Sequence, residues 1–239
     1  MGRFDTLAKK TPVLRLLYGI LRSRLARSRA SDPNRIFTQI HSSNAWRGKD
    51  SRSGTGSDAG QTRILVKELP VLFRNFGIST MLDIPCGDFH WMKNVDLSGV
   101  EYTGADIVAD LVRQNARRHA RRGVHFRKLD LMEDRLPKVD LVFCRDCLVH
   151  LSFYDILRAL QNVCRSDSRF ILTTTFTGRS ENHDIATGQW RALNLALEPF
   201  ALPAPRRILV EGCTEGDGAY ADKSLGLWQI ADIRRHLFQ

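Results

Sequence analysis

Long hydrophobic runs are missing from this sequence. Its longest apolar stretches, such as residues 16–21 and 141–144, are far shorter than the roughly 20 residues that cross a bilayer. Cysteine is scarce as well, with five residues, an odd number that lacks the spacing of a disulfide framework. We therefore expect no membrane-spanning segment, free thiols in a reducing compartment, and a cytoplasmic location.

The residues that are present suit one folded domain with an extension. The chain is 43% hydrophobic and 26% charged, which excludes collagenous, low-complexity and wholly disordered proteins. Residues 1–30 carry eight basic residues and one acidic residue, so most of the net charge of +10 lies there. Apolar side chains recur in this arm at steps of three and four, which predicts a basic amphipathic helix. Two roles stay open for it, namely peripheral contact with an anionic membrane at its inner face and docking on a protein surface.

The rest of the chain divides into a polar segment and a domain. Residues 31–61, rich in glycine and serine over 47–61, predict a linker or lid. From residue 62 helical and strand patterns alternate, as in a parallel sheet with helices on both faces. The alternation predicts strands at 79–84, 101–106, 125–129, 140–144 and 169–175, and helices over 108–122 and 153–164.

The C-terminal part breaks this alternation. Residues 177–205 are polar, hold three prolines at their end and predict an insertion. Two later apolar runs, at 207–211 and 224–230, have no helix-length segment between them, so they predict an antiparallel hairpin at the sheet edge. The predicted fold class is therefore α/β, a doubly wound, mostly parallel sheet that ends in a hairpin.

Acidic residues end successive predicted strands. Asp83 ends the first strand and is followed by Gly87, whose lack of a side chain allows a ligand to approach the backbone. Asp106 ends the second strand, where a carboxylate can accept hydrogen bonds from two ribose hydroxyls. Asp130 follows the third strand and can accept from an exocyclic amino group, with Leu131 packed on the base. In an open α/β sheet such strand ends surround the ligand.

With acidic residues at the ends of successive strands, residues 62–239 resemble bacterial class I S-adenosylmethionine-dependent methyltransferases. The likeness extends to DxPCGDFxWM at 83–92, to SRSGxGS before it and to EGCTEGxGAYADKSLGLW near the end. It implies a Rossmann-like sheet of seven strands and S-adenosylmethionine as the cofactor, with its methionine part at Asp83 and Gly87, its ribose at Asp106 and its adenine at Asp130. The cofactor-binding residues that it implies are Asp83, Pro85, Cys86, Gly87, Asp106, Ile107, Asp130, Leu131 and Arg145.

A nicotinamide-dependent Rossmann oxidoreductase is the alternative reading of the fold. It is disfavoured because Pro85 and Phe89 stand where the phosphate-binding turn has glycines, and only Gly87 is kept. Cys144 and Cys147 form a C-x-x-C motif without a second pair, so we expect no bound metal.

Methyl transfer requires alignment and, for a hydroxyl acceptor, removal of a proton. His150 and Asp146 follow the fourth predicted strand and are the candidate catalytic residues, although His150 can equally cap or pin the next helix. The insertion offers an aromatic platform among polar groups, which predicts acceptor binding by Trp190, Arg191 and Asn194.

The expected reaction is O-methylation of a small-molecule or glycan acceptor. The alternatives are methylation of a protein or nucleic acid and a non-catalytic cofactor-binding module. We expect no nucleic-acid partner, because the arginines of the helix over 108–122 have no aromatic residues between them and predict a solvated face.

Overall fold

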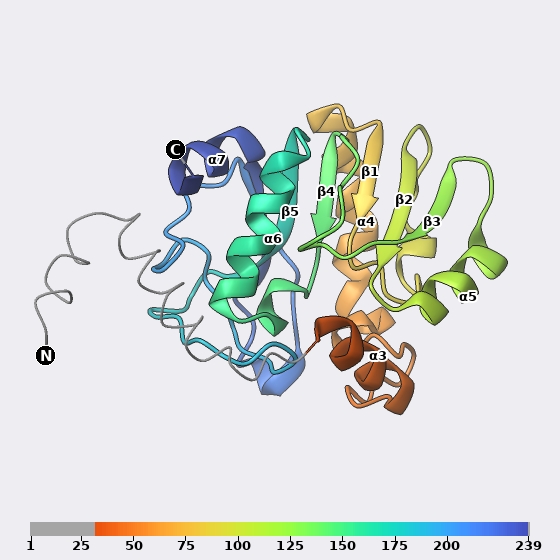
Figure 1. Cartoon of the computed structure of the whole chain (residues 1–239), viewed down its shortest axis with the longest axis horizontal. Helices are drawn as coiled ribbons and strands as arrows, with labels where there is room; N and C mark the ends of the chain where they lie inside the picture. Colours follow the sequence, from red (N-terminus) through yellow and green to blue (C-terminus); the bar gives the residue numbers. More distant parts are fainter. Residues whose placement is uncertain (1–31, 239) are drawn as a thin grey trace, which may run out of the picture.

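The computed structural model describes residues 32–238, which contain one sheet of seven strands (Figure 1). The strands lie in the order β3-β2-β1-β4-β5-β7-β6, and β7 runs antiparallel to both of its neighbours. Their bounds are β1 Thr80–Asp83, β2 Glu101–Asp106, β3 Val124–Lys128, β4 Leu141–Cys144, β5 Phe170–Phe176, β6 Arg207–Val210 and β7 Lys223–Gln229. The predicted fold class, a mostly parallel, doubly wound sheet with an antiparallel C-terminal hairpin, is confirmed.

Helices cover both faces of the sheet (Figure 1). The apolar side of α4 (Ala59–Phe76) packs on one face, whereas α6 (Phe153–Arg165) and α7 (Ile230–Phe238) pack on the other. All seven residues of β5 are buried because both sides of this central strand are covered. The helix α7 was not predicted from the sequence.

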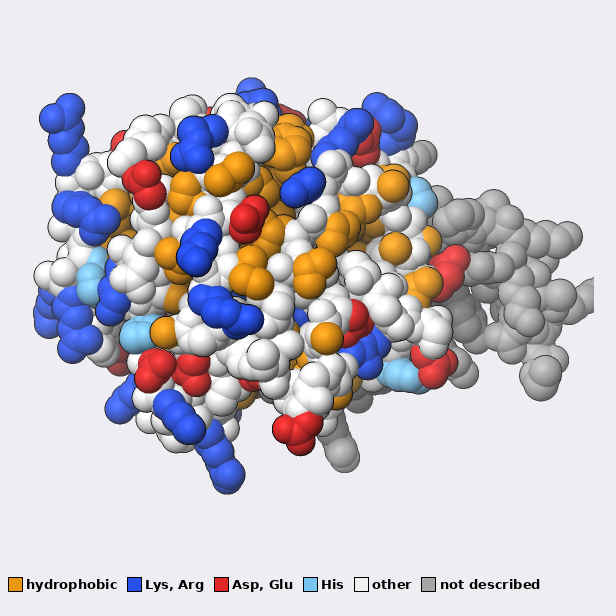
Figure 2. Space-filling model, turned by 180° about the vertical axis from the view of Figure 1, so that it is seen from behind, with side chains coloured by type: hydrophobic (Ala, Val, Ile, Leu, Met, Phe, Trp, Pro, Cys, Tyr) orange, Lys and Arg blue, Asp and Glu red, His pale blue; other side chains and the backbone are white. Residues whose placement is uncertain are grey.

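The remaining long helix, α5 (Ala109–His119), packs beside β2 and β3. Its basic side chains face solvent, as predicted, and Lys and Arg gather along this edge of the molecule (Figure 2). The exposed cations of α5 and of the segment after it are Arg113, Arg117, Arg118, Arg121, Arg122, Arg127 and Lys128.

The segment predicted as a linker or lid, residues 31–61, contains a helix. This helix, α3 (Pro33–Ser43), begins where the Asp32 carboxylate accepts a hydrogen bond from the Asn34 N–H at 2.9 Å, and it ends at Asn44 in the left-handed conformation. A short 3-10 turn, Thr55–Ser57, and the first turn of α4 complete the segment. The arm and the amphipathic helix predicted over residues 1–30 lie outside the described residues. Within residues 32–238 no helix is long and apolar enough to cross a membrane.

The insertion at 177–205 contains neither a helix nor a strand. It is nevertheless part of the core, since its buried side chains pack with those of α6 and α7. These side chains are Leu193, Leu195, Phe200 and Leu202. The insertion is therefore fixed against the domain along much of its length.

Candidate active site

One cavity lies at the carboxyl ends of β1, β2, β3 and β4. All nine residues predicted to bind the cofactor line it, and so do both predicted catalytic residues, Asp146 and His150. The parallel register explains why residues far apart in sequence meet here, because neighbouring parallel strands end at the same edge.

Asp83 forms the floor of the cavity at the end of β1. Its side chain is buried, and the Tyr102 hydroxyl donates a hydrogen bond of 2.6 Å to Oδ2. Burial raises the pKa of Asp83 to about 8, although the hydrogen bond from Tyr102 opposes that rise. A cationic ligand would favour the ionised form of this carboxyl group.

The turn after β1 brings the backbone to the wall of the cavity. Gly87 has φ +54°, and a Cβ atom there would lie 2.3 Å from Ser53 Oγ, so only glycine fits. Its N–H donates to Asp106 Oδ2 at 3.2 Å, and its carbonyl oxygen accepts from Asn115 Nδ2 at 2.7 Å. Cys86, beside it, is buried, and burial raises the pKa of its thiol.

Asp106 and Asp130 end β2 and follow β3. The Oδ1 atom of Asp106 accepts from the Val108 N–H at 3.0 Å, and burial raises the pKa of Asp106 to about 6 despite this bond. Asp130 Oδ1 accepts from the Met132 N–H at 2.7 Å, and burial raises its pKa as well. Each carboxylate keeps lone pairs for further donors, as recognition of a ribose and an adenine requires.

The sequence did not identify a second wall of this cavity, which comes from the segment before α4. Six of its residues line the cavity, namely Phe37, His41, Trp46, Arg52, Ser53 and Ser57. The segment is held by Asp88, which accepts from Ser51 Oγ at 2.9 Å and from the Arg52 N–H at 3.1 Å. The SRSGTGS motif was the sequence signal for this wall, but its polar composition indicated only a loop.

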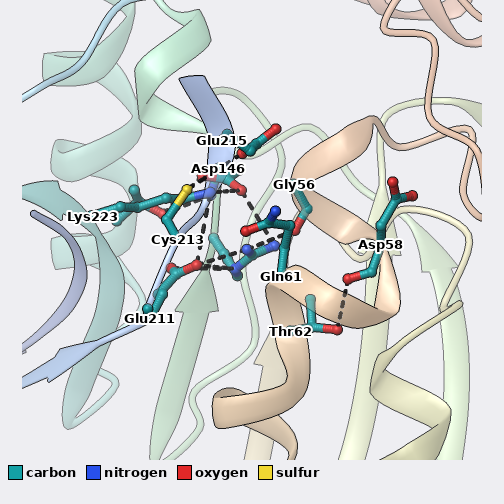
Figure 3. Close-up of polar contacts among 12 residues, drawn as sticks. Gly56, Asp58, Gln61, Thr62, Asp146, Glu211, Cys213, Glu215 and Lys223 are labelled. Carbon is teal, nitrogen blue, oxygen red and sulfur yellow. Dashed lines mark hydrogen bonds and ion pairs between the residues drawn. The ribbon is translucent and has the colours of Figure 1, made fainter. Parts of the chain in front are cut away.

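A buried group of charged side chains lies behind the end of β4 (Figure 3). Arg145 pairs with Glu211, with Nη2 and Oε2 2.7 Å apart, and its Nη2 also donates to the Gly56 carbonyl oxygen at 2.8 Å. Lys223 pairs with Asp146 at 2.6 Å, and Arg145 Nη1 lies 3.2 Å from the same Asp146 oxygen. Arg145 was predicted to bind the cofactor. It does line the cavity, but its hydrogen bonds go to Glu211 and to the backbone of the SRSGTGS loop.

These cations change the assignment of Asp146. Burial by itself disfavours the carboxylate, but Arg145 and Lys223 outweigh it and hold the pKa of Asp146 well below its usual range. A carboxylate that binds protons so weakly is a poor general base near neutral pH. Asp146 therefore fits a role in orientation and charge, and not the proton-accepting role that its position in the sequence indicated.

His150 lies on the cavity wall with one ring nitrogen already engaged. Its Nδ1 lies 3.0 Å from the Gln189 carbonyl oxygen and must donate to it, since a carbonyl oxygen only accepts. The neutral ring then keeps the Nε2 lone pair free. The Trp46 ring stacks on the imidazole, with centroids 4.7 Å apart. Burial lowers the pKa of His150, although Gln189 and Asp146 oppose that change.

The predicted acceptor-binding residues are not among those that line the cavity. Asn194 holds the insertion together, since its Nδ2 donates to the Arg179 carbonyl oxygen at 3.1 Å. Trp190 is 43% exposed and packs against Tyr220. Arg191 is buried behind His150. The polar composition of the insertion reflects bonds within the insertion and to the turn before His150.

Cys147 lines the cavity, and Cys144 is buried next to it. Both are free thiols. Among residues 32–238 no group of three or more metal-ligating side chains comes together.

The sheet order and the acidic strand ends around one cavity define a Rossmann-like α/β fold with a ligand site at the carboxyl edge of its sheet. Residues 81–166, from β1 through α6, match a family model described as a methyltransferase domain. No curated protein matches the sequence.

Solved structures share the fold at low sequence identity. Human N-acetylserotonin methyltransferase in complex with SAM is 14% identical, with a TM-score of 0.55 over 95% of this chain and 69% of that chain. The methyltransferase domain of bacterial CtHen1-C is 13% identical, with a TM-score of 0.52 over 72% and 98% of the two chains. The PH0226 protein from Pyrococcus horikoshii OT3 is 16% identical, with a TM-score of 0.50 over 72% and 92%.

The residues of the cavity fit S-adenosylmethionine. Asp83 is a buried acid with a raised pKa, which a sulfonium or an ammonium group complements. Asp106 is a buried acid whose carboxylate can accept hydrogen bonds from ribose hydroxyls. Gly87 lies in the turn beside Asp83, where a Cβ atom would meet Ser53 Oγ, so the glycine lets this turn pack against the SRSGTGS loop. The adenine end is apolar on one side, with Leu129 and Leu131 beside Asp130. Charge and polarity in the cavity therefore support the cofactor predicted from the sequence.

Proposed function

We propose that the protein methylates a hydroxyl group of a small-molecule or glycan acceptor, with His150 as the proton acceptor. The observation that carries this proposal is the fixed ring of His150 on the cavity wall. Because Nδ1 donates to the Gln189 carbonyl oxygen, Nε2 is the atom left to accept a proton.

Bound S-adenosylmethionine supplies a methyl group that its sulfonium sulfur activates. The chain's own residues then align the acceptor and take the proton. The acceptor O–H bond breaks and its proton passes to His150 Nε2, while the acceptor oxygen would take the methyl group from the sulfonium sulfur, which would leave as a neutral thioether. The ionised Asp146 nearby favours the imidazolium that results. Trp46 restricts the imidazole to the stacked orientation.

A small acceptor is favoured by the walls that enclose this end of the cavity. Phe37 and Trp46 line it on one side. The insertion closes against α3, where a Cβ atom on Gly188 would lie 2.6 Å from Ile36 Cγ2. Such close packing between α3 and the insertion suits a compact acceptor better than a protein or a nucleic-acid strand.

The proposal is tested with labelled methyl donor and an unbiased mixture of metabolites. We expect label in the oxygen-methyl group of one compound class. His150→Ala should lower its formation by about 10²–10⁴-fold, because the proton acceptor is lost. Cofactor affinity, measured by calorimetry, should stay near the wild-type value. His119→Ala, which alters a histidine on α5, is the matched control and should keep the wild-type rate.

Two results would refute the proposal. One is wild-type turnover by His150→Ala, which would make alignment alone responsible for catalysis. The other is label that appears only on nitrogen, carbon, protein or nucleic acid.

A further inference from the structure

Arg191 lies buried directly behind the turn that carries His150. Its side chain is 7% exposed, and Nη1 donates to the carbonyl oxygens of Leu148 at 3.3 Å and Val149 at 3.0 Å. The guanidinium group lies over the Phe153 ring, 5.3 Å from its centroid. These contacts place a positive charge next to the two residues that precede His150.

This cation is poorly compensated. Its Nε and Nη2 atoms are buried and have no hydrogen-bond partner among the described residues. Burial lowers the pKa of Arg191 to about 10, so the group stays charged near neutral pH. Asp184 opposes that decrease, but its Oδ1 accepts from the N–H groups of Phe153 and Ile185. A buried charge without full compensation destabilises a fold.

The backbone does not need this side chain. The Val149 carbonyl oxygen also accepts from the Arg191 N–H at 3.1 Å, and the Leu148 carbonyl oxygen also accepts from the Leu151 N–H at 3.2 Å. A neutral side chain of similar length would leave neither carbonyl without a donor. Stability alone therefore does not explain an arginine at this position.

We propose that Arg191 is a positioning residue, which keeps His150 neutral and aligned as a proton acceptor. This inference rests on the proposed function of His150. The insertion holds the histidine at three points. The Gly188 N–H donates to the His150 carbonyl oxygen at 2.8 Å, the Gln189 carbonyl oxygen accepts from the ring, and Arg191 binds the turn before it.

The charges around His150 come from three parts of the chain. Asp146, after β4, favours the imidazolium, whereas Lys223 of β7 and Arg191 of the insertion oppose it. Burial also opposes it and has the largest effect. Removing Arg191 leaves Asp146 and Lys223 as the charges that act on His150. The protonated imidazole is then less disfavoured, and a protonated ring cannot accept a proton from the acceptor.

The test compares Arg191→Met with Arg191→Lys, which keeps the charge. We expect Arg191→Met to keep or raise the thermal midpoint, because a buried and partly unpaired cation is replaced by an apolar side chain. The NMR titration of His150, identified as the signal lost in His150→Ala, should move up toward the ordinary pKa of about 6.5. The acid limb of kcat should move to higher pH by the same amount while the cofactor Kd stays unchanged. Arg191→Lys should return the pKa of His150 and the acid limb of kcat toward their wild-type values.

Arg179→Met is the matched control in the same insertion. Arg179 is paired with Asp222, with Nη2 and Oδ1 2.7 Å apart, so its loss should lower stability and leave the His150 titration unchanged. The proposal is overturned if Arg191→Met loses stability while His150 titrates as in the wild type. It is also overturned if His150 of the wild-type protein titrates at or above the ordinary histidine value. Full turnover by His150→Ala refutes the proposed function itself, so the two failures are distinguishable.

Discussion

At the scale of single residues, the acidic residues at the strand ends differ in the groups that surround them. Asp83 and Asp106 are both buried at the cofactor end of the cavity, and their hydrogen-bond donors are a hydroxyl group and backbone N–H groups. Asp146, one strand further along, is bound by two cations. The first two carboxyls therefore have raised pKa values and the third a lowered one. Their different surroundings suit cation binding in one place and a fixed negative charge in the other.

Asp106→Asn should weaken cofactor binding at least tenfold. It removes charge-assisted hydrogen bonds to the ribose hydroxyls, each worth roughly 1.5–3 kcal/mol. The pH dependence should change as well. Ribose O–H donors favour the ionised carboxyl group, whose pKa is about 6, so wild-type affinity should fall as the pH drops through that value. Calorimetry between pH 5 and pH 7 checks both expectations.

Asp96→Asn, on the exposed turn before β2, is the control and should bind the cofactor like the wild type. Unchanged affinity in Asp106→Asn, or a pH dependence that survives the substitution, would remove Asp106 from the cofactor site.

At the scale of elements, the buried charge cluster joins three separate segments. Arg145 and Asp146 follow β4, Glu211 and Lys223 flank the connection between β6 and β7, and Gly56 belongs to the SRSGTGS loop (Figure 3). A Cβ atom on Gly56 would lie 3.0 Å from Asp146 Oδ2, which explains the glycine in that motif. The cluster thus fixes the loop that forms the second wall of the cavity.

Glu211→Gln should lower the free energy of unfolding by about 3–5 kcal/mol. The substitution removes one partner of a buried ion pair and leaves Asp146 as the ion-pair partner of Arg145 and Lys223 among the described residues. Chemical denaturation at neutral pH measures the effect. Asp110→Asn, which breaks an exposed pair with Arg113, should cost about 1 kcal/mol or less. Equal losses in the two variants would contradict a structural role for the buried cluster.

At the scale of the whole molecule, the cavity is shared between the domain and the segment that precedes it. Among residues 32–238, those that line the cavity lie between positions 37 and 151. The strand ends supply one wall, and α3 with the loop after it supplies the other. Truncations that end before and after α3 therefore distinguish the contribution of the basic arm from that of α3.

Deleting residues 1–30 should leave cofactor affinity and the thermal midpoint unchanged, since every described residue that lines the cavity is kept. Deleting residues 1–46 should weaken cofactor binding, because Phe37, His41 and Trp46 are lost with α3. Calorimetry and thermal unfolding on both truncated proteins test this contrast. Loss of affinity in the shorter deletion would show that the arm takes part in the site.

The sequence by itself determined the strands of the sheet and the acidic residues that gather at their carboxyl ends. Alternating apolar periods predict strands and helices locally, and parallel strands must end at one edge, so Asp83, Asp106 and Asp130 had to meet. The antiparallel hairpin also followed from local evidence, because no helix-length segment separates the last two apolar runs.

Only the tertiary structure decided the acceptor end. The type of a polar residue does not show whether its side chain faces a ligand or a carbonyl group of the chain. Arg191 and Asn194 bind backbone groups, while Phe37 and Trp46, from a segment read as a linker or lid, line the cavity. Asp146 differs from the other acids because two cations bind it, its neighbour Arg145 and Lys223, which is 77 residues away in sequence and lies 2.6 Å from it. Contacts over such distances arise from packing, and no local pattern records them.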